Sequence, residues 1–205
     1  MKSNDLILIV SAPSGAGKTT LIERLRKELR MRFVVSHTTR AQRATEANGS
    51  DYHFVDDSTF KTMVMKDEFA EWARVHGSFY GTSLAEIAYV SHMHTGTILD
   101  VDWQGARQIK ARIPDAVSVF VVPPSMRELE RRLTARGTET SESLKTRIGA
   151  AAEEMKHYAM YDYVVVNENL GEAYEALSSI AVAETCRTRK RSQACESIIR
   201  GDEIK

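Results

Sequence analysis

The sequence of 205 residues has little cysteine, no net charge and no long apolar run. Its two cysteines, Cys186 and Cys195, lie outside any spacing typical of a metal site. We expect them to be free thiols in a reducing compartment, which predicts a cytoplasmic location. No stretch approaches the roughly 18 consecutive apolar residues of a membrane span, and the first residues do not resemble a secretory signal. A membrane partner is therefore not expected.

Charge of neither sign is in excess, because 28 Lys and Arg balance 28 Asp and Glu. This balance argues against binding to a nucleic-acid polymer, which needs a surplus of basic residues. The charges are unevenly spread, with nine basic and four acidic residues at 1–50 but three basic and nine acidic residues at 51–102. The alternation suggests patches with different tasks, although solvated helix faces alone could produce it.

Apolar runs of strand length alternate with amphipathic helical patterns along most of the chain. The run at residues 6–10 is typical of a strand buried on both faces of a parallel sheet. Further strands are expected at 97–99, 116–122 and 163–166, and helices at 19–30, 104–111, 125–135, 144–158 and 171–185. This order predicts an α/β fold with a parallel sheet flanked by helices.

Residues 36–94 interrupt the alternation. They combine a short strand-like piece at 52–55 with helical stretches at 58–66 and 84–90. Because no linker rich in Pro, Gly or Ser flanks them, we interpret them as an inserted subdomain. After Thr185 the basic run at 187–191 shows no periodicity, and we expect a solvated, frayed terminus there.

Ten residues between the first strand and the first helix, 11–20, read SAPSGAGKTT. Small residues there let backbone N–H groups converge on phosphate oxygens at a helix N-terminus. Lys18 would reach the β- and γ-phosphates, and the Thr19 hydroxyl would bind Mg²⁺ directly. The P-loop pattern has Gly where this sequence has Ala12, a position that need not have a positive φ. The alternative is a Gly-rich connection that happens to contain a lysine.

The strand at 97–99 leads into two carboxylates, Asp100 and Asp102. Asp100 could orient the water shell of Mg²⁺ beside a P-loop. Because many strands end in Asp, the position of Asp100 indicates a magnesium site only in combination with the P-loop.

The P-loop alone allows a GTPase, an ATP-driven machine or a small-molecule kinase, and the insert helps to decide between them. Arg40 and Arg43, with hydroxyl neighbours and Tyr52, could hold a phosphate monoester by charge-assisted hydrogen bonds. Two solvated surface arginines are the alternative. Glu71 lies in the apolar stretch FAEWA, where a lone carboxylate needs a partner.

Taken in order, these segments resemble the guanylate kinase family in its bacterial form. The resemblance rests on SAPSGAGKTT, SHTTR, NGSDYHFV, EFAEWA, FYGTS, ILDVDWQGA, PPS, RGTETSESLKTR and YDYVVVNEN, which span nearly the whole chain. The chain departs from the family pattern at Gln42 and Thr45, where Pro and Gly are usual, and at Ala12 and Phe79, where Gly and Tyr are frequent.

The resemblance implies one domain over 1–205 with a P-loop NTPase-type core (1–35, 95–125 and 156–205), a GMP-binding insert (36–94) and a helical lid (126–155). It implies Mg²⁺-dependent transfer of the ATP γ-phosphoryl group to GMP or dGMP. ATP would contact Ala12, Pro13, Ser14, Gly15, Ala16, Gly17, Lys18, Thr19, Thr20, Arg132, Arg136 and Asn167. GMP would contact Ser36, Arg40, Arg43, Tyr52, Glu71, Tyr80, Thr82 and Asp102. The catalytic residues would be Lys18, Arg40, Arg136 and Arg147, and Mg²⁺ would be held by Thr19 and, through water, by Asp100.

Base chemistry supports this assignment. Guanine presents two donors, N1–H and its exocyclic amine, which suit the two oxygens of an ionised Glu71, whereas N1 of adenine is an acceptor. The acceptor phosphate is already anionic, so no general base is needed, and catalysis is expected to rest on positioning and charge neutralisation. Two alternatives stay open. One is a non-catalytic protein-binding module of the same fold. The other is a P-loop kinase with a different phosphate acceptor, and the role of Glu71 in base recognition would distinguish it from a GMP kinase. A homo-oligomer is also possible.

Overall fold

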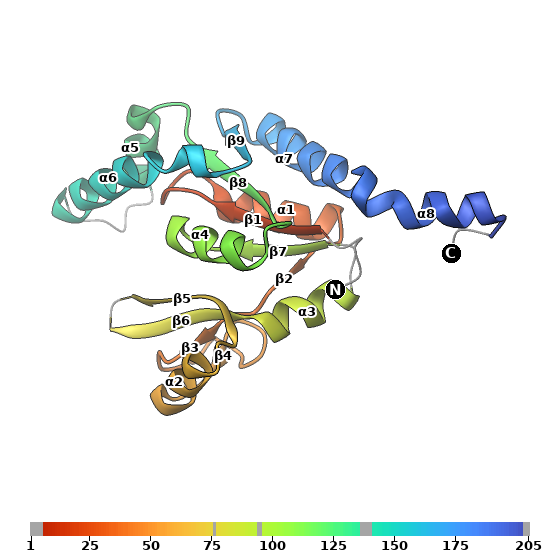
Figure 1. Ribbon diagram of the computed structural model, residues 1–205. Coiled ribbons are helices and arrows are strands. Elements are labelled where there is room, and N and C mark those ends of the chain that lie inside the picture. Colours follow the sequence, from red (N-terminus) through yellow and green to blue (C-terminus); the bar gives the residue numbers. More distant parts are fainter. Residues whose placement is uncertain (1–5, 76, 94–95, 136–140, 203–205) are drawn as a thin grey trace.

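The computed structural model describes residues 6–75, 77–93, 96–135 and 141–202 (Figure 1). Its main sheet has five parallel strands in the order β2-β7-β1-β8-β9. The parallel α/β architecture predicted from the sequence is therefore confirmed. The strands are β1 (Leu6–Ser11), β2 (Arg32–Phe33), β7 (Gly96–Asp100), β8 (Val117–Val122) and β9 (Tyr163–Val166).

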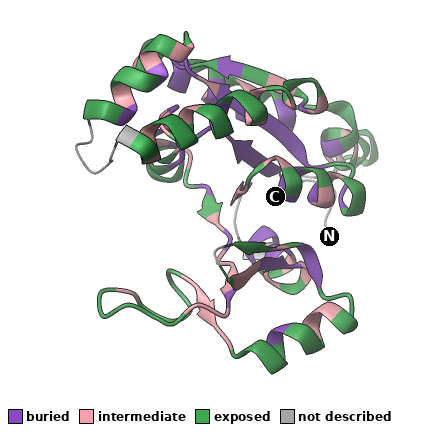
Figure 2. Cartoon of the chain, turned by 90° about the vertical axis from the view of Figure 1, so that its left-hand side faces the viewer, coloured by how far each residue is buried: buried purple, intermediate pink, exposed green. Residues whose placement is uncertain are grey.

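The central strand, β1, is buried along its whole length because helices cover both faces of the sheet. Leu6, Leu8 and Val10 pack in one core, with α1 (Lys18–Glu28) and α7 (Leu170–Thr185). Ile7 and Ile9 pack in the other, with α3 (Leu84–Met93) and α4 (Trp103–Arg112). Alternate side chains point to opposite faces of a strand, so burial on both faces requires an unbroken apolar run. Figure 2 shows these buried strands between mostly exposed helices.

A second sheet, in the order β4-β3-β6-β5, lies on one side of the main sheet (Figure 1). In its core, Phe60 stacks on Phe69 and Phe79 with ring centroids 4.4 and 5.3 Å apart. The sequence patterns did not predict the antiparallel pair β5 and β6, whose residues mix Gly and Ser with aromatics. The elements are β3 (His37–Thr38), β4 (His53–Phe54), α2 (Asp57–Met65), β5 (Phe69–Val75) and β6 (Ser78–Ser83).

Two helices, α5 (Met126–Ala135) and α6 (Ser141–Met155), pack against each other around Leu129, Leu133 and Ala151. The helix predicted at 144–158 thus begins earlier and ends earlier than expected. It is followed by a single 3₁₀ turn, η1 (Tyr158–Met160).

The expectation of a frayed terminus after Thr185 is wrong. A helix, α8 (Thr188–Arg200), follows α7 and extends away from the body of the protein (Figure 1). Arg187 binds the buried Glu184 through two hydrogen bonds of 2.7 and 2.6 Å, and Arg189 pairs with Asp115. Arg187 thus attaches the start of this helix to the end of α7, and Arg189 attaches it to Asp115, 74 residues earlier in the chain. An ion pair with so distant a residue leaves no local periodicity in the sequence.

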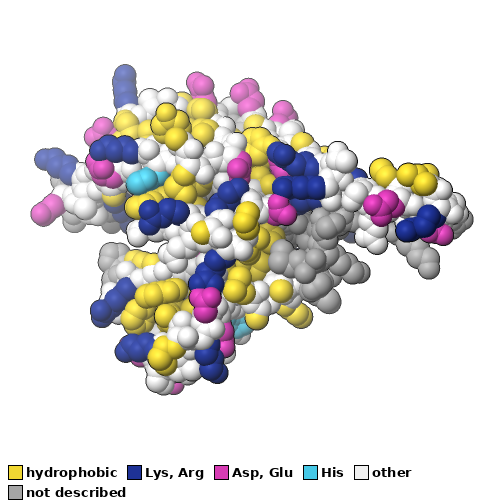
Figure 3. Space-filling model, viewed as in Figure 1, with side chains coloured by type: hydrophobic (Ala, Val, Ile, Leu, Met, Phe, Trp, Pro, Cys, Tyr) yellow, Lys and Arg dark blue, Asp and Glu magenta, His cyan; other side chains and the backbone are white. Residues whose placement is uncertain are grey.

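The surface carries charges of both signs side by side over the face seen in Figure 3. Cys186 and Cys195 are exposed free thiols, as predicted. Within the described part of the chain, no helix is both long and apolar enough to cross a membrane.

Candidate active site

The loop between β1 and α1 has the backbone geometry of a phosphate cradle. Gly15 and Gly17 have φ angles of 92° and 94°, in the region that favours glycine. Gly17 is the N-cap of α1 and offers no side-chain cap to the first N–H groups of the helix. These groups and the positive end of the helix dipole are thus available to an anion.

Asn167, at the end of β9, fixes this loop from the opposite side. Its buried side-chain amide donates a hydrogen bond of 2.7 Å to the backbone oxygen of Ala16. A Cβ atom on Gly17 would overlap the same amide, so this position has room only for glycine. The backbone oxygen of Asn167 accepts a 2.9 Å hydrogen bond from Arg132 of α5. The amide therefore supports the loop backbone, and the contact of Asn167 with ATP stays a prediction.

The loop opens into a cavity of about 420 Å³ at the carboxyl ends of β1 and β7. In it the Lys18 ammonium forms an ion pair with Asp100. Ligands of open α/β sheets bind at this edge of the strands. The cavity is lined by Ala12, Pro13, Ser14, Gly15, Gly17, Lys18, Thr19, Thr20, Asp100, Asp102 and Glu154.

The donor atoms in this cavity suit Mg²⁺. The Thr19 hydroxyl is the kind of oxygen ligand that Mg²⁺ prefers, and the Asp100 carboxylate can accept hydrogen bonds from waters bound to the ion. Three carboxylates face one lysine, so the cavity has an excess of negative charge that a divalent cation would offset. No cluster of three or more Asp, Glu, His or Cys among the described residues could hold a metal by itself. Mg²⁺ bound jointly by protein and phosphate oxygens fits such a site.

A second set of polar groups lies in the sheet formed by β3 to β6. Thr82 donates a 2.6 Å hydrogen bond to the carboxylate of Glu71, and its hydroxyl lies 3.0 Å from that of Ser36. Burial raises the pKa of Glu71, and the hydrogen bond from Thr82 partly offsets this. Asp102 accepts a hydrogen bond from Gly105 N at 2.9 Å and caps α4. A Cβ atom on Gly105 would lie 3.3 Å from Glu71 Oε2, so α4 begins close to this carboxylate.

Arg40 is held by a residue that the sequence analysis did not single out. Its guanidinium donates to both oxygens of Glu46, at 3.1 and 2.7 Å, and Glu46 also accepts from the backbone N–H of Arg43 at 2.8 Å. Arg40 Cζ lies 5.6 Å from the centre of the Tyr52 ring, whose centroid is 5.9 Å from that of Tyr80. Three of the predicted phosphate-binding residues thus lie together, whereas the Arg43 side chain is exposed.

Gln42, one of the departures from the family pattern, has a structural role. Its side-chain amide donates a 2.6 Å hydrogen bond to the backbone oxygen of Glu46. It thereby closes the loop that presents Arg40 and Arg43. A proline at this position would restrict the loop through its ring but could not form this bond.

Of the three predicted arginines at 126–155, the structure describes Arg132 and Arg147. Arg132 contacts Asn167, as described above, and is held by Glu128 at 2.8 Å. Arg147 is exposed on α6, and Arg136 lies outside the described residues.

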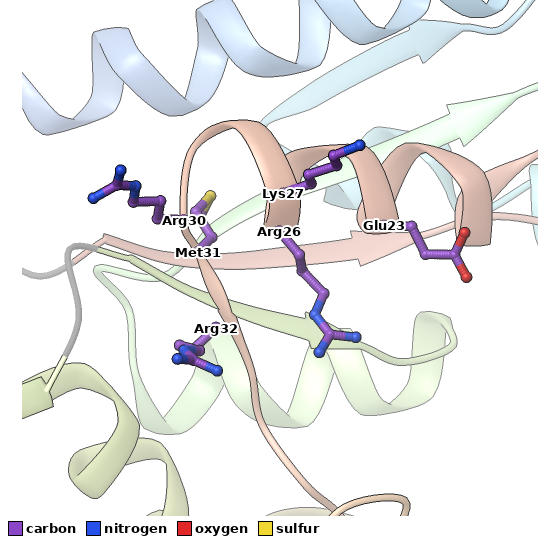
Figure 4. A pocket seen from close by; sticks show the side chains of 6 residues that line it. All are labelled: Glu23, Arg26, Lys27, Arg30, Met31 and Arg32. Atoms are coloured by element: carbon purple, nitrogen blue, oxygen red, sulfur yellow. The ribbon is translucent and has the colours of Figure 1, made fainter.

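A further hollow of about 520 Å³ is remote from this chemistry, at the end of α1 and the start of β2. Its cationic side chains, Arg26, Lys27, Arg30 and Arg32, point in different directions (Figure 4). They do not converge on one position, so we place the active site at the P-loop.

Comparison with known proteins agrees with this geometry. Residues 4–184 match the family described as Guanylate kinase. The chain is 47% identical over 196 residues to a guanylate kinase of Syntrophotalea carbinolica, covering 95% of this chain and 93% of the relative. It is 43% identical over 203 residues to that of Geobacter sulfurreducens, covering 98% and 100%. The crystal structure of guanylate kinase from Anaplasma phagocytophilum aligns with a TM-score of 0.70 and 36% identity, over 93% of this chain and 91% of that one.

Proposed function

Since the chain belongs to the guanylate kinase family, we propose that its P-loop cavity and its Glu71 site together carry out transfer of the ATP γ-phosphoryl group to GMP or dGMP. The chain is an ATP:GMP phosphotransferase, a nucleoside monophosphate kinase. The observation that carries the residue assignment is the buried Glu71 carboxylate, held by Thr82 close to the start of α4.

Glu71 would recognise the guanine edge. An ionised carboxylate accepts hydrogen bonds from N1–H and the exocyclic amine, and Thr82 and Ser36 keep it oriented. Adenine would present a lone pair to the same oxygens. A site built on such hydrogen bonds can reject a base that lacks the donors by a factor on the order of 10⁴.

Arg40, with Tyr52 and Tyr80 beside it, would hold the GMP phosphate. Ser36 and Arg43 would contact the same phosphate. The attacking oxygen belongs to this phosphate and carries no proton that a base must remove. The work of the protein is to align the phosphate with the γ-phosphorus of ATP and to exclude water.

On the ATP side, the N–H groups of the loop and the Lys18 ammonium would bind the phosphates. Lys18 must then leave its ion pair with Asp100, which frees that carboxylate for the magnesium water shell. Mg²⁺, held by Thr19 and through water by Asp100, would neutralise charge on the phosphates. Arg132, Arg136 and Arg147 would add positive charge from the proposed lid at 126–155.

The finer assignments remain part of this proposal: the core, insert and lid boundaries, the cytoplasmic location, and the absence of membrane or nucleic-acid partners. The free thiols support the cytoplasmic location. The balanced charge supports the absence of a nucleic-acid partner.

The proposed function is tested by an ADP-release assay that offers GMP, dGMP, AMP, CMP and UMP in parallel. We expect turnover with GMP and dGMP, and a loss of several orders of magnitude in kcat for Lys18→Ala with GMP binding retained. Near-normal turnover by Lys18→Ala would refute the P-loop assignment. Equal turnover with AMP would refute the role of Glu71.

A further inference from the structure

Glu154, near the end of α6, lies in the phosphate cavity although no sequence motif drew attention to it. It lines the cavity together with the P-loop, Asp100 and Asp102. Its side chain is half-buried, whereas that of its neighbour Glu153 is exposed. Burial raises the pKa of Glu154, the charge of Asp102 raises it further, and Lys18 lowers it, so these three groups are close enough to interact.

The position of Glu154 is fixed by the turn that follows it. Its backbone oxygen accepts a 3.1 Å hydrogen bond from the N–H of His157. The imidazole of His157 stacks on the indole of Trp103, with centroids 3.7 Å apart and planes inclined by 11°. Trp103 begins α4 directly after Asp102. The end of α6 is therefore attached to the segment that carries the cavity carboxylates.

The charges of the cavity make Glu154 unfavourable for a bare nucleotide. Lys18 is the only cation among the described residues that line the cavity, where it lies with Asp100, Asp102 and Glu154. When Lys18 turns to the phosphates, those carboxylates lie beside a polyanion. In a partly buried site such repulsion is much stronger than in water. A nucleotide whose charge is reduced by a divalent cation avoids most of it.

We propose that Glu154 is a specificity-determining residue that makes the cavity select the Mg²⁺ complex of the nucleotide over the metal-free nucleotide. This role rests on the proposed ATP site. Glu154 need not bind the metal itself. Its negative charge penalises phosphate oxygens that lack a cation, and its attraction to the cation offsets that penalty when the metal is present.

The test is the dissociation constant of ADP, measured by isothermal titration calorimetry with excess Mg²⁺ and with EDTA. For Glu154→Gln we expect the constant in EDTA to fall by about tenfold and that in Mg²⁺ to change less than about threefold. Glu154→Ala should behave in the same way. Glu153→Gln is the matched control, because Glu153 is exposed and pairs with Lys156 at 2.6 Å. Its ratio of the two constants should equal that of the wild type.

The inference would be overturned if the ratio of the ADP dissociation constants in EDTA and in Mg²⁺ were unchanged in both Glu154 variants. An equal weakening of ADP binding in both buffers would also overturn it. Turnover of GMP by the wild type is measured separately. A wild-type protein that binds ADP but does not phosphorylate GMP would refute the proposed function, while the ADP ratios would still decide the role of Glu154.

Discussion

Asn167 donates its side-chain amide to the backbone oxygen of Ala16 at 2.7 Å and thereby joins β9 to the P-loop. We expect Asn167→Ala to lower the free energy of unfolding by about 1–3 kcal/mol, because it leaves a buried carbonyl without its partner. It should also weaken ADP binding by about tenfold or more, because the loop loses its support. Urea denaturation and ADP titration measure the two effects.

Asn169→Ala is the control for this prediction. Asn169 caps α7 by accepting from Gly171 N at 2.8 Å, so its loss should cost about 1 kcal/mol of stability without affecting the loop. If both variants bound ADP like the wild type, Asn167 would have no role in shaping the P-loop.

Glu71→Gln should separate activity from stability. The neutral amide presents a donor to guanine, so kcat/KM for GMP should fall by at least about tenfold and discrimination against AMP should weaken. Because burial raises the pKa of Glu71, the folded protein binds this proton more tightly than the unfolded chain does. Stability is therefore lost as pH rises through the usual range of a glutamate towards the raised pKa.

The stability of Glu71→Gln relative to the wild type should consequently be greater at pH 8 than at pH 4, as measured by urea denaturation at both values. Equal differences at the two pH values would show that Glu71 carries no burial penalty.

Glu46 is expected to act by orienting Arg40. The variant Glu46→Ala should raise KM for GMP by about tenfold and change kcat less than about threefold. The reason is that the Arg40 guanidinium loses both of its hydrogen bonds to the Glu46 carboxylate. Asp51→Asn, which alters another carboxylate of the same loop, should leave KM unchanged. A loss confined to kcat would assign Glu46 to the chemical step instead.

His37 should make the protein sensitive to acid. Burial, and in smaller part the charge of the neighbouring His53 ring, whose centroid lies 4.7 Å away, lower its pKa to about 4. The unfolded chain takes up this proton near pH 6.5, so stability is lost as pH falls from there towards 4, by about 1–2 kcal/mol after allowance for solvent screening of this half-buried ring. Urea denaturation should show a smaller loss between pH 7 and pH 4.5 for His37→Gln. An identical loss would exclude His37 as the cause.

The sequence predicted features whose determinants are consecutive residues. The P-loop lies within 11–20, and the strand that ends at Asp100 is marked by its own apolar run, so local patterns sufficed for both. The cavity position of Glu154 and the loop contact of Asn167 depend on chain segments that meet only in the fold. Glu46 lies six residues from Arg40, but their loop is irregular and has no periodic pattern that predicts which side chains meet. The attachment of α8 through Arg189 and Asp115 likewise joins segments that are distant in the sequence.

The order of strands in the main sheet also bears on how the protein is made. The central strand, β1, is synthesised before both of its partners, which begin at Gly96 and Val117. Until they emerge from the ribosome, its run of five aliphatic residues has no hydrogen-bonded neighbour in the sheet. A nascent chain of this kind is prone to aggregate, and its sheet cannot close before synthesis is more than half complete.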